Sequence, residues 1–115
     1  MENEERVKLI DDQLSHVWMV RTFLKHSEEA EEDDELNEVF RGLYDYMLAL
    51  GAPLTDGDYE KYLKIAKKKI KKLKATTELF EEIQPEISTH TNFKMARQSL
   101  RLAVDNVAKL IETDG

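Results

Sequence analysis

Apolar residues recur along most of the chain at alternating spacings of three and four, which is the period of one face of an α-helix. The pattern divides the sequence into four segments, each long enough for a helix that buries one stripe. We expect helices at about residues 4–27, 34–50, 56–84 and 92–112. The stripe of the first segment consists of Val7, Ile10, Leu14, Val17, Arg21 and Leu24.

Glycine and proline mark the expected helix ends. Gly51 favours a left-handed cap after the second segment, and Pro53 blocks its continuation. Thr55 or Asp56 is then expected to cap the third helix, and Pro85 to end or kink it. Four helices with short connections favour antiparallel neighbours. The sequence therefore predicts an all-α, up-and-down antiparallel four-helix bundle that takes up all 115 residues as a single domain.

Composition narrows the functional classes. Hydrophobic residues make up 41% and charged residues 36% of the chain, which suffices for one core. Cysteine is absent, which excludes a disulfide framework, a thiolate metal site and a cysteine nucleophile. The first ten residues are acidic, and no apolar segment approaches the length of a membrane span. We therefore expect a soluble cytoplasmic protein without contact to a membrane.

Charge is distributed unevenly within the net value of -7. Residues 28–35 are acidic except for Ala30, and residues 61–74 carry eight lysines. A lysine run of this kind can follow a phosphate backbone. However, it lacks arginine, and its neighbours Tyr59 and Tyr62 fall on the core stripe. We expect a solvated helix face, partly neutralised by carboxylates of neighbouring helices, and no binding of nucleic acid.

Arg21 lies near the centre of the first apolar stripe, where a charge is costly unless it is paired. We expect its partners to be carboxylates of residues 28–35 or terminal carbonyls; otherwise it marks a ligand or anion site. Antiparallel helices would bring it to the same end of the bundle as His26, His90 and Asn92. These four residues are the candidate ligand or anion site.

Positions 21–26 read Arg-Thr-Phe-Leu-Lys-His. This segment resembles the arginine–histidine motif of HEPN domains, small helical bundles that include RNases. The resemblance implies a nucleic-acid-binding or nucleotide-binding protein in which Arg21 polarises a phosphate and His26 serves as acid or base. It covers six residues only. Thr22 stands where the family often has Asn, Asp or His, and the family usually carries the motif on a later helix.

Other catalytic or metal-binding patterns are absent from the sequence. Metal sites in bundles use Glu-x-x-His, but the residue three places before each histidine is Gln13, Phe23 or Ile87. Serine turns flanked by glycine and phosphate-binding glycine loops are also missing. We therefore predict no catalytic residue, no metal and no cofactor, and an enzymatic role is disfavoured but left open.

The first helix carries a second stripe opposite its core stripe, with apolar residues among polar ones. A helix in an isolated bundle needs only one apolar face, and an exposed apolar patch is typical of an interface. Because most soluble oligomers are symmetric, we predict a non-enzymatic interaction or scaffold protein that forms a homodimer through this helix. A different protein as partner is the alternative. Met19 and Phe23 are the expected anchors. The predicted interface comprises Leu9, His16, Met19, Phe23, Tyr44 and Leu48.

Overall fold

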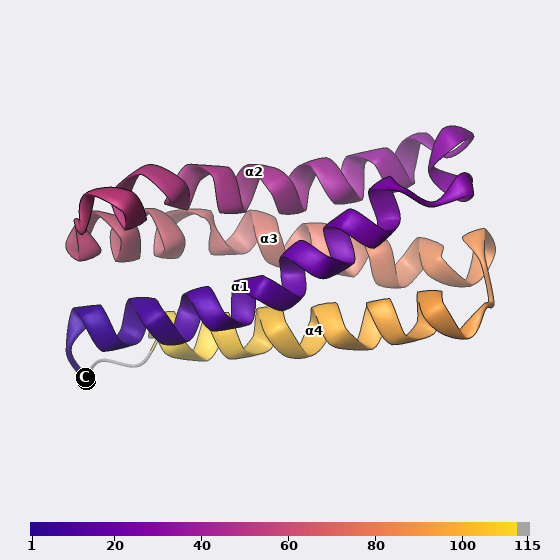
Figure 1. The fold of residues 1–115 in the computed structure, drawn as a ribbon. Coiled ribbons are helices and arrows are strands. Elements are labelled where there is room, and N and C mark those ends of the chain that lie inside the picture. Colours follow the sequence, from indigo (N-terminus) through magenta and orange to yellow (C-terminus); the bar gives the residue numbers. More distant parts are fainter. Residues whose placement is uncertain (113–115) are drawn as a thin grey trace.

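The computed structural model describes residues 1–112, and four long helices make up almost all of this range (Figure 1). Each helix packs on the next along the chain, and α1 packs on α4, which closes the ring. Consecutive helices run in opposite directions (Figure 1). The predicted up-and-down antiparallel four-helix bundle is confirmed. Its elements are α1 (Asn3–Lys25), the short 3₁₀ helix η1 (Glu28–Glu31), α2 (Asp34–Asp56), α3 (Tyr59–Ile87) and α4 (Thr91–Glu112).

A continuous apolar core runs through the bundle and draws on all four helices. The stripe predicted for α1 is confirmed at every position except one, because Val20 is buried and Arg21 is not. Val17, Val20 and Leu24 keep the alternating spacing, so Arg21 lies at the edge of the buried face. The largest wholly buried side chains include Ile10, Leu24, Leu36, Leu43, Tyr62, Leu73, Phe80 and Leu100.

The second helix continues past the end predicted for it. Gly51 and Pro53 lie inside α2, and Pro53 is buried. The helix ends at Gly57, whose φ of 69° is left-handed, with the amide of Asp58 donating to the Pro53 carbonyl. Proline removes one hydrogen bond near the helix end, and its buried ring offsets this loss. The expected cap at Gly51 was wrong, since Gly57 provides it.

The third helix begins and ends later than predicted. Asp58, rather than Thr55 or Asp56, is its N-terminal cap, and its Oδ1 accepts a hydrogen bond from the Lys61 amide at 3.1 Å. Pro85 does not end the helix, because it lies in the last turn and removes a single backbone hydrogen bond there.

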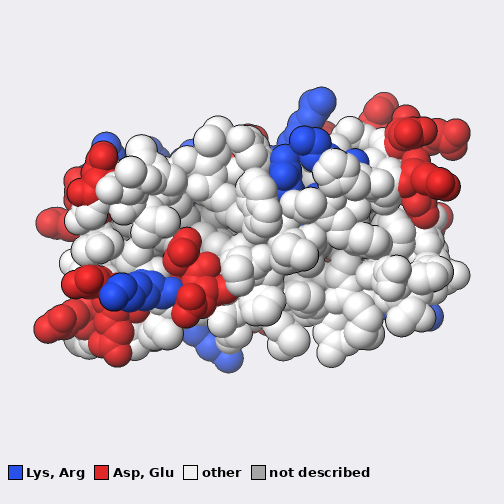
Figure 2. Space-filling view, in the orientation of Figure 1, with Lys and Arg blue, Asp and Glu red and all other residues white. Residues whose placement is uncertain are grey.

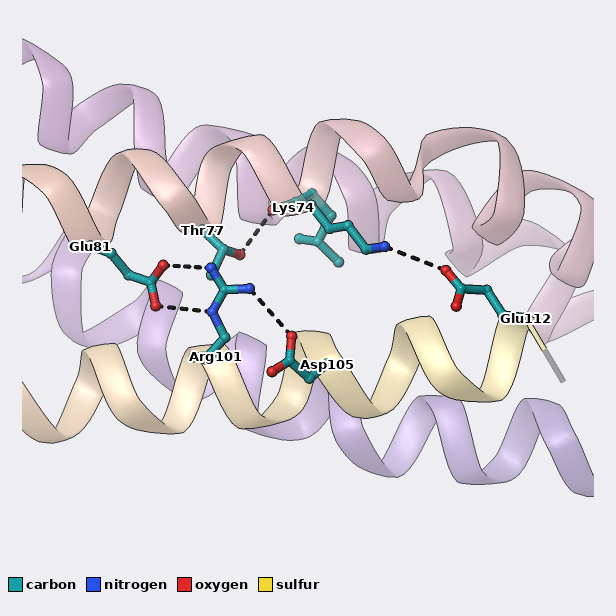
Figure 3. A network of polar contacts seen from close by, with 7 residues as sticks. Lys74, Thr77, Glu81, Arg101, Asp105 and Glu112 are labelled. Atoms are coloured by element: carbon teal, nitrogen blue, oxygen red, sulfur yellow. Dashed lines mark hydrogen bonds and ion pairs between the residues drawn. The ribbon is translucent and has the colours of Figure 1, made fainter.

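α3 makes a close contact with α2 and forms ion pairs with α4. On the α2 side, a Cβ at Gly42 would lie 2.7 Å from Thr76 Oγ1, so a larger residue there would force the Thr76 side chain to shift. On the α4 side, Arg101 reaches across to Glu81 (Figure 3). Of the lysines in the run at 61–74, Lys74 is the one with a described carboxylate in salt-bridge distance, Glu112 at 3.4 Å. No helix within residues 1–112 combines the length and apolar character that crossing a membrane requires.

Candidate functional site

The residues predicted as a ligand or anion site separate into different local roles. His90 and Asn92 shape the start of α4, where the amide of Asn92 donates to His90 Nδ1 at 3.0 Å. His26 is exposed and follows the last residue of α1, and its amide donates to the Thr22 carbonyl. Within residues 1–112, no hydrogen bond, ion pair or ring contact joins Arg21 or His26 to another member of the set.

Arg21 has aromatic partners instead of the expected carboxylates. Its guanidinium carbon lies 4.8 Å from the ring centroid of Trp18 and 4.8 Å from that of Tyr44. Aromatic faces attract a guanidinium electrostatically and allow it to stack flat. Its Nε is buried without a described hydrogen-bond partner. Trp18 was missed by the sequence reasoning, although it stands three places before Arg21 and therefore on the same side of the helix.

A surface with large exposed apolar side chains surrounds this stack. Met19 is 66% exposed, Leu48 61%, Met95 54% and Trp18 44%. In Figure 2, the lower right of the molecule carries few charged atoms, while acidic side chains gather in the left part and at the upper right and a basic cluster lies at the upper centre. We call this surface the α1 face. It comprises Trp18, Met19, Arg21, Tyr44, Leu48 and Met95.

The predicted interface residues differ in how far they reach this surface. Leu9 and His16 on α1 are exposed, like Met19. Tyr44 is half-buried beneath Arg21. Phe23 is half-buried as well, because its ring packs edge-on against Phe93 of α4, with the two centroids 5.1 Å apart. Phe23 therefore serves an internal contact between α1 and α4 and offers less surface to a partner than its spacing predicts.

A cavity of about 240 Å³ opens between α1 and α2 beside Trp18. Its apolar wall is formed by Leu14 and Trp18 from α1 and by Met47, Leu50 and Leu54 from α2. Its polar lining comes from Asp11 and Ser15 on α1 and from Tyr62 on α3.

Two of the polar groups in this cavity lack a partner within the described part of the chain. The Tyr62 hydroxyl is buried without any hydrogen bond. Burial, together with the nearby Asp11 carboxylate, raises the pKa of this hydroxyl, so it stays protonated at neutral pH. Burial and, secondly, the neighbouring Asp12 raise the pKa of Asp11. Tyr62 was predicted to lie on the core stripe of the third helix. Because Asp11 belongs to the first helix, no sequence spacing predicts that the two residues share a cavity.

A second groove lies between α3 and α4, where Lys94, Arg97 and Arg101 contribute to its lining. The Arg101 guanidinium is held by Glu81 and Asp105, as Figure 3 shows. Arg97 donates to the Gln84 side chain at 3.3 Å. The guanidinium groups of Arg97 and Arg101 therefore already have partners on α3 and α4. Within residues 1–112, no three His, Asp or Glu side chains come together in a way that would hold a metal ion.

Comparisons of the chain with protein-family models, with curated proteins and with solved structures give no significant match.

Proposed function

We propose that the protein is a small non-enzymatic interaction protein that forms a symmetric homodimer through the α1 face. The observation that carries this proposal is the exposure of Trp18, Met19, Leu48 and Met95 around a single stacked arginine. Apolar surface of this kind gains free energy when it leaves water. Patches of large exposed apolar side chains on a small domain are typical of interfaces.

Charge favours a second copy approaching through this face. Each chain carries a net charge of -7, so two copies repel each other over most orientations. Arg21 is the one charged residue among the six that define the α1 face. A two-fold interface needs only one self-complementary patch, because each copy presents the same residues to the other.

The stack of Arg21 on Trp18 and Tyr44 supports the same function. Tryptophan, tyrosine and arginine are the residue types that most often dominate binding energy at interfaces. Here all three are held against one another before any partner arrives. Preorganised side chains lose less conformational entropy on binding.

The experiment that tests this proposal replaces Met19 and Leu48 with glutamate. Light scattering during size-exclusion chromatography should give the wild type twice the 13.4 kDa mass of one chain. The double variant should elute as a single chain, because two buried carboxylates per copy would remain unpaired in the interface. Circular dichroism should show equal helix content, since both positions are exposed in the isolated bundle.

Leu102→Glu is the matched control. Leu102 is 58% exposed, but it lies by the groove between α3 and α4 and outside the α1 face. This variant should keep the wild-type mass. A wild type with the mass of one chain at every concentration would refute the homodimer, and so would a double variant with unchanged mass.

A further inference from the structure

We propose that the cavity between α1 and α2 binds a small organic cation, an ammonium group carried on a compact apolar body. The proposal rests on the cavity's own residues and not on the homodimer. Trp18 is shared by the cavity and the α1 face, but Met19 and Leu48 do not line the cavity. The two proposals can therefore fail separately.

The Tyr62 hydroxyl favours a ligand that carries a polar group. Tyr62 is wholly buried, it is one of the residues that line the cavity, and its hydroxyl has no partner among the described residues. A buried hydroxyl without a hydrogen bond destabilises the folded protein, and such groups are rare in native structures. A polar group of a ligand that reaches this hydroxyl would provide the missing partner, because a neutral phenol both donates and accepts hydrogen bonds.

The carboxylate of Asp11 favours a ligand with a positive charge. Asp11 lines the cavity, and no ion pair or hydrogen bond joins its carboxylate to the described residues. The adjacent Asp12 repels its negative charge, and a bound cation would offset this repulsion. No positively charged side chain lines the cavity. Arg21 stacks on Trp18 and is absent from the lining. An anionic ligand would therefore meet repulsion from Asp11.

The wall and the volume of the cavity favour a ligand with a compact apolar body. Leu14, Met47, Leu50 and Leu54 form an apolar wall next to Trp18, so the part of the ligand that faces them is apolar. The volume of about 240 Å³ lies below the range of about 300–1,000 Å³ typical of drug-sized ligands, which favours a compact molecule. Ser15 adds no free donor, because its hydroxyl already donates to the Asp12 carbonyl at 2.6 Å.

The test compares three probes with the same ring and different charge: cyclohexylammonium, cyclohexanol and cyclohexanecarboxylate. Each is titrated into the full chain at pH 7 while the fluorescence of Trp18, the single tryptophan, and the backbone amide NMR signals are recorded. Cyclohexylammonium should produce saturable changes at residues 11–18 and 47–54. The alcohol and the carboxylate should bind at least about tenfold more weakly, because the alcohol offers Asp11 no positive charge and the carboxylate is repelled by it.

Variants connect the binding to the two polar groups. Asp11→Asn and Tyr62→Phe should each weaken cyclohexylammonium binding about tenfold. Asp12→Asn is the matched control, because Asp12 is a neighbouring carboxylate that does not line the cavity, and its variant should bind like the wild type. Asp11 lies at the surface, so its variant keeps the fold whatever happens in the core.

Three outcomes would overturn the proposal. The first is that none of the probes binds. The second is that cyclohexanol binds as tightly as cyclohexylammonium, which would mean that the charge of Asp11 plays no part. The third is that Asp11→Asn and Asp12→Asn weaken binding equally, which would indicate general attraction of a cation to an acidic protein.

Discussion

At the scale of single residues, Tyr46 and Tyr62 occupy similar buried positions but differ in their hydrogen bonding. The Tyr46 hydroxyl donates to the Ala66 carbonyl at 3.0 Å, whereas the Tyr62 hydroxyl has no described partner. Burial is the main cause that raises the pKa of both phenols, so both stay neutral. The same substitution, loss of one hydroxyl, should therefore affect stability in opposite directions at the two positions.

We predict that Tyr62→Phe raises the free energy of unfolding by about 1 kcal/mol and that Tyr46→Phe lowers it by about 1 kcal/mol. The first substitution removes a buried group without a partner, and the second removes a hydrogen bond. Urea unfolding followed by circular dichroism measures both. A loss of stability in Tyr62→Phe would show that its hydroxyl is satisfied in the ligand-free protein, for example by water.

The contacts of Arg21 were predicted only in part from the sequence. Its position in the apolar stripe correctly indicated that it needs a partner, but the expected partners were carboxylates. Trp18 was accessible from the sequence through its spacing of three. Tyr44 was assigned to the same surface, but its place under the guanidinium depends on how α1 crosses α2, which no local pattern encodes.

At the scale of elements, an ion pair joins α3 to α4. Arg101 Nε donates to Glu81 Oε2 at 2.9 Å, and its Nη2 binds the other carboxylate oxygen (Figure 3). Asp105, one turn further along α4, accepts from Arg101 Nη1 at 3.3 Å. Two parallel hydrogen bonds fix the relative position of the helices more precisely than apolar contact alone.

This pair predicts a pH dependence of stability. Hydrogen bonding from Arg101 holds the pKa of the Glu81 carboxyl below its ordinary value of 4.5. The stabilisation is therefore complete well above pH 4.5 and is lost as the pH falls through the folded-state pKa. Glu81→Gln should be about 1 kcal/mol less stable than the wild type at pH 7, and the two should become equally stable in acid. Chemical unfolding at a series of pH values measures this.

Glu82→Gln is the control for this experiment, because Glu82 is exposed and forms no described ion pair. Its stability should follow that of the wild type at every pH. A difference between the wild type and Glu81→Gln that does not change with pH would mean that the carboxylate's charge is not what stabilises the contact.

The C-terminal end of α2 shows that a local sequence signal for a helix end does not always stop the helix. Gly51 followed by Pro53 is a common signal for a helix end. The helix nevertheless continues, because the Pro53 ring is buried and Gly57 offers a left-handed residue one turn later. The extension has a consequence for the site, since it places Leu54 in the cavity wall. In a helix that ended at residue 50, Leu54 would not be held in this wall by the helix.

At the scale of the whole molecule, the net charge of -7 bears on how two copies meet. If they meet through the weakly charged α1 face, the long-range repulsion between the copies opposes association. Salt screens this repulsion, since the screening length falls from about 30 Å at 0.01 M to about 8 Å at 0.15 M. The bundle is 22 × 19 Å across, which is less than the screening length at 0.01 M and more than that at 0.15 M. Charges across both copies therefore repel one another at low salt and are largely screened at the higher concentration.

We therefore predict that the homodimer becomes tighter as sodium chloride rises from 0.01 M to 0.15 M. Sedimentation equilibrium at several salt concentrations measures the dissociation constant. Weaker association at higher salt would contradict dimerisation through the α1 face. It would instead indicate ion pairs between copies, for which the exposed lysines of α3 and the acidic residues of η1 are the available partners.

The sequence by itself determined the helical class, the number of helices, their antiparallel order and most of the buried stripe positions. These follow from periodic patterns in which each residue's role depends on neighbours three or four places away. It also indicated that α1 carries more apolar surface than one core requires. Only the tertiary structure decided that Arg21 stacks on Trp18 and Tyr44, and that Asp11 and Tyr62 share a cavity. Those groups come from different helices, and their meeting depends on crossing angles and on side-chain packing between helices.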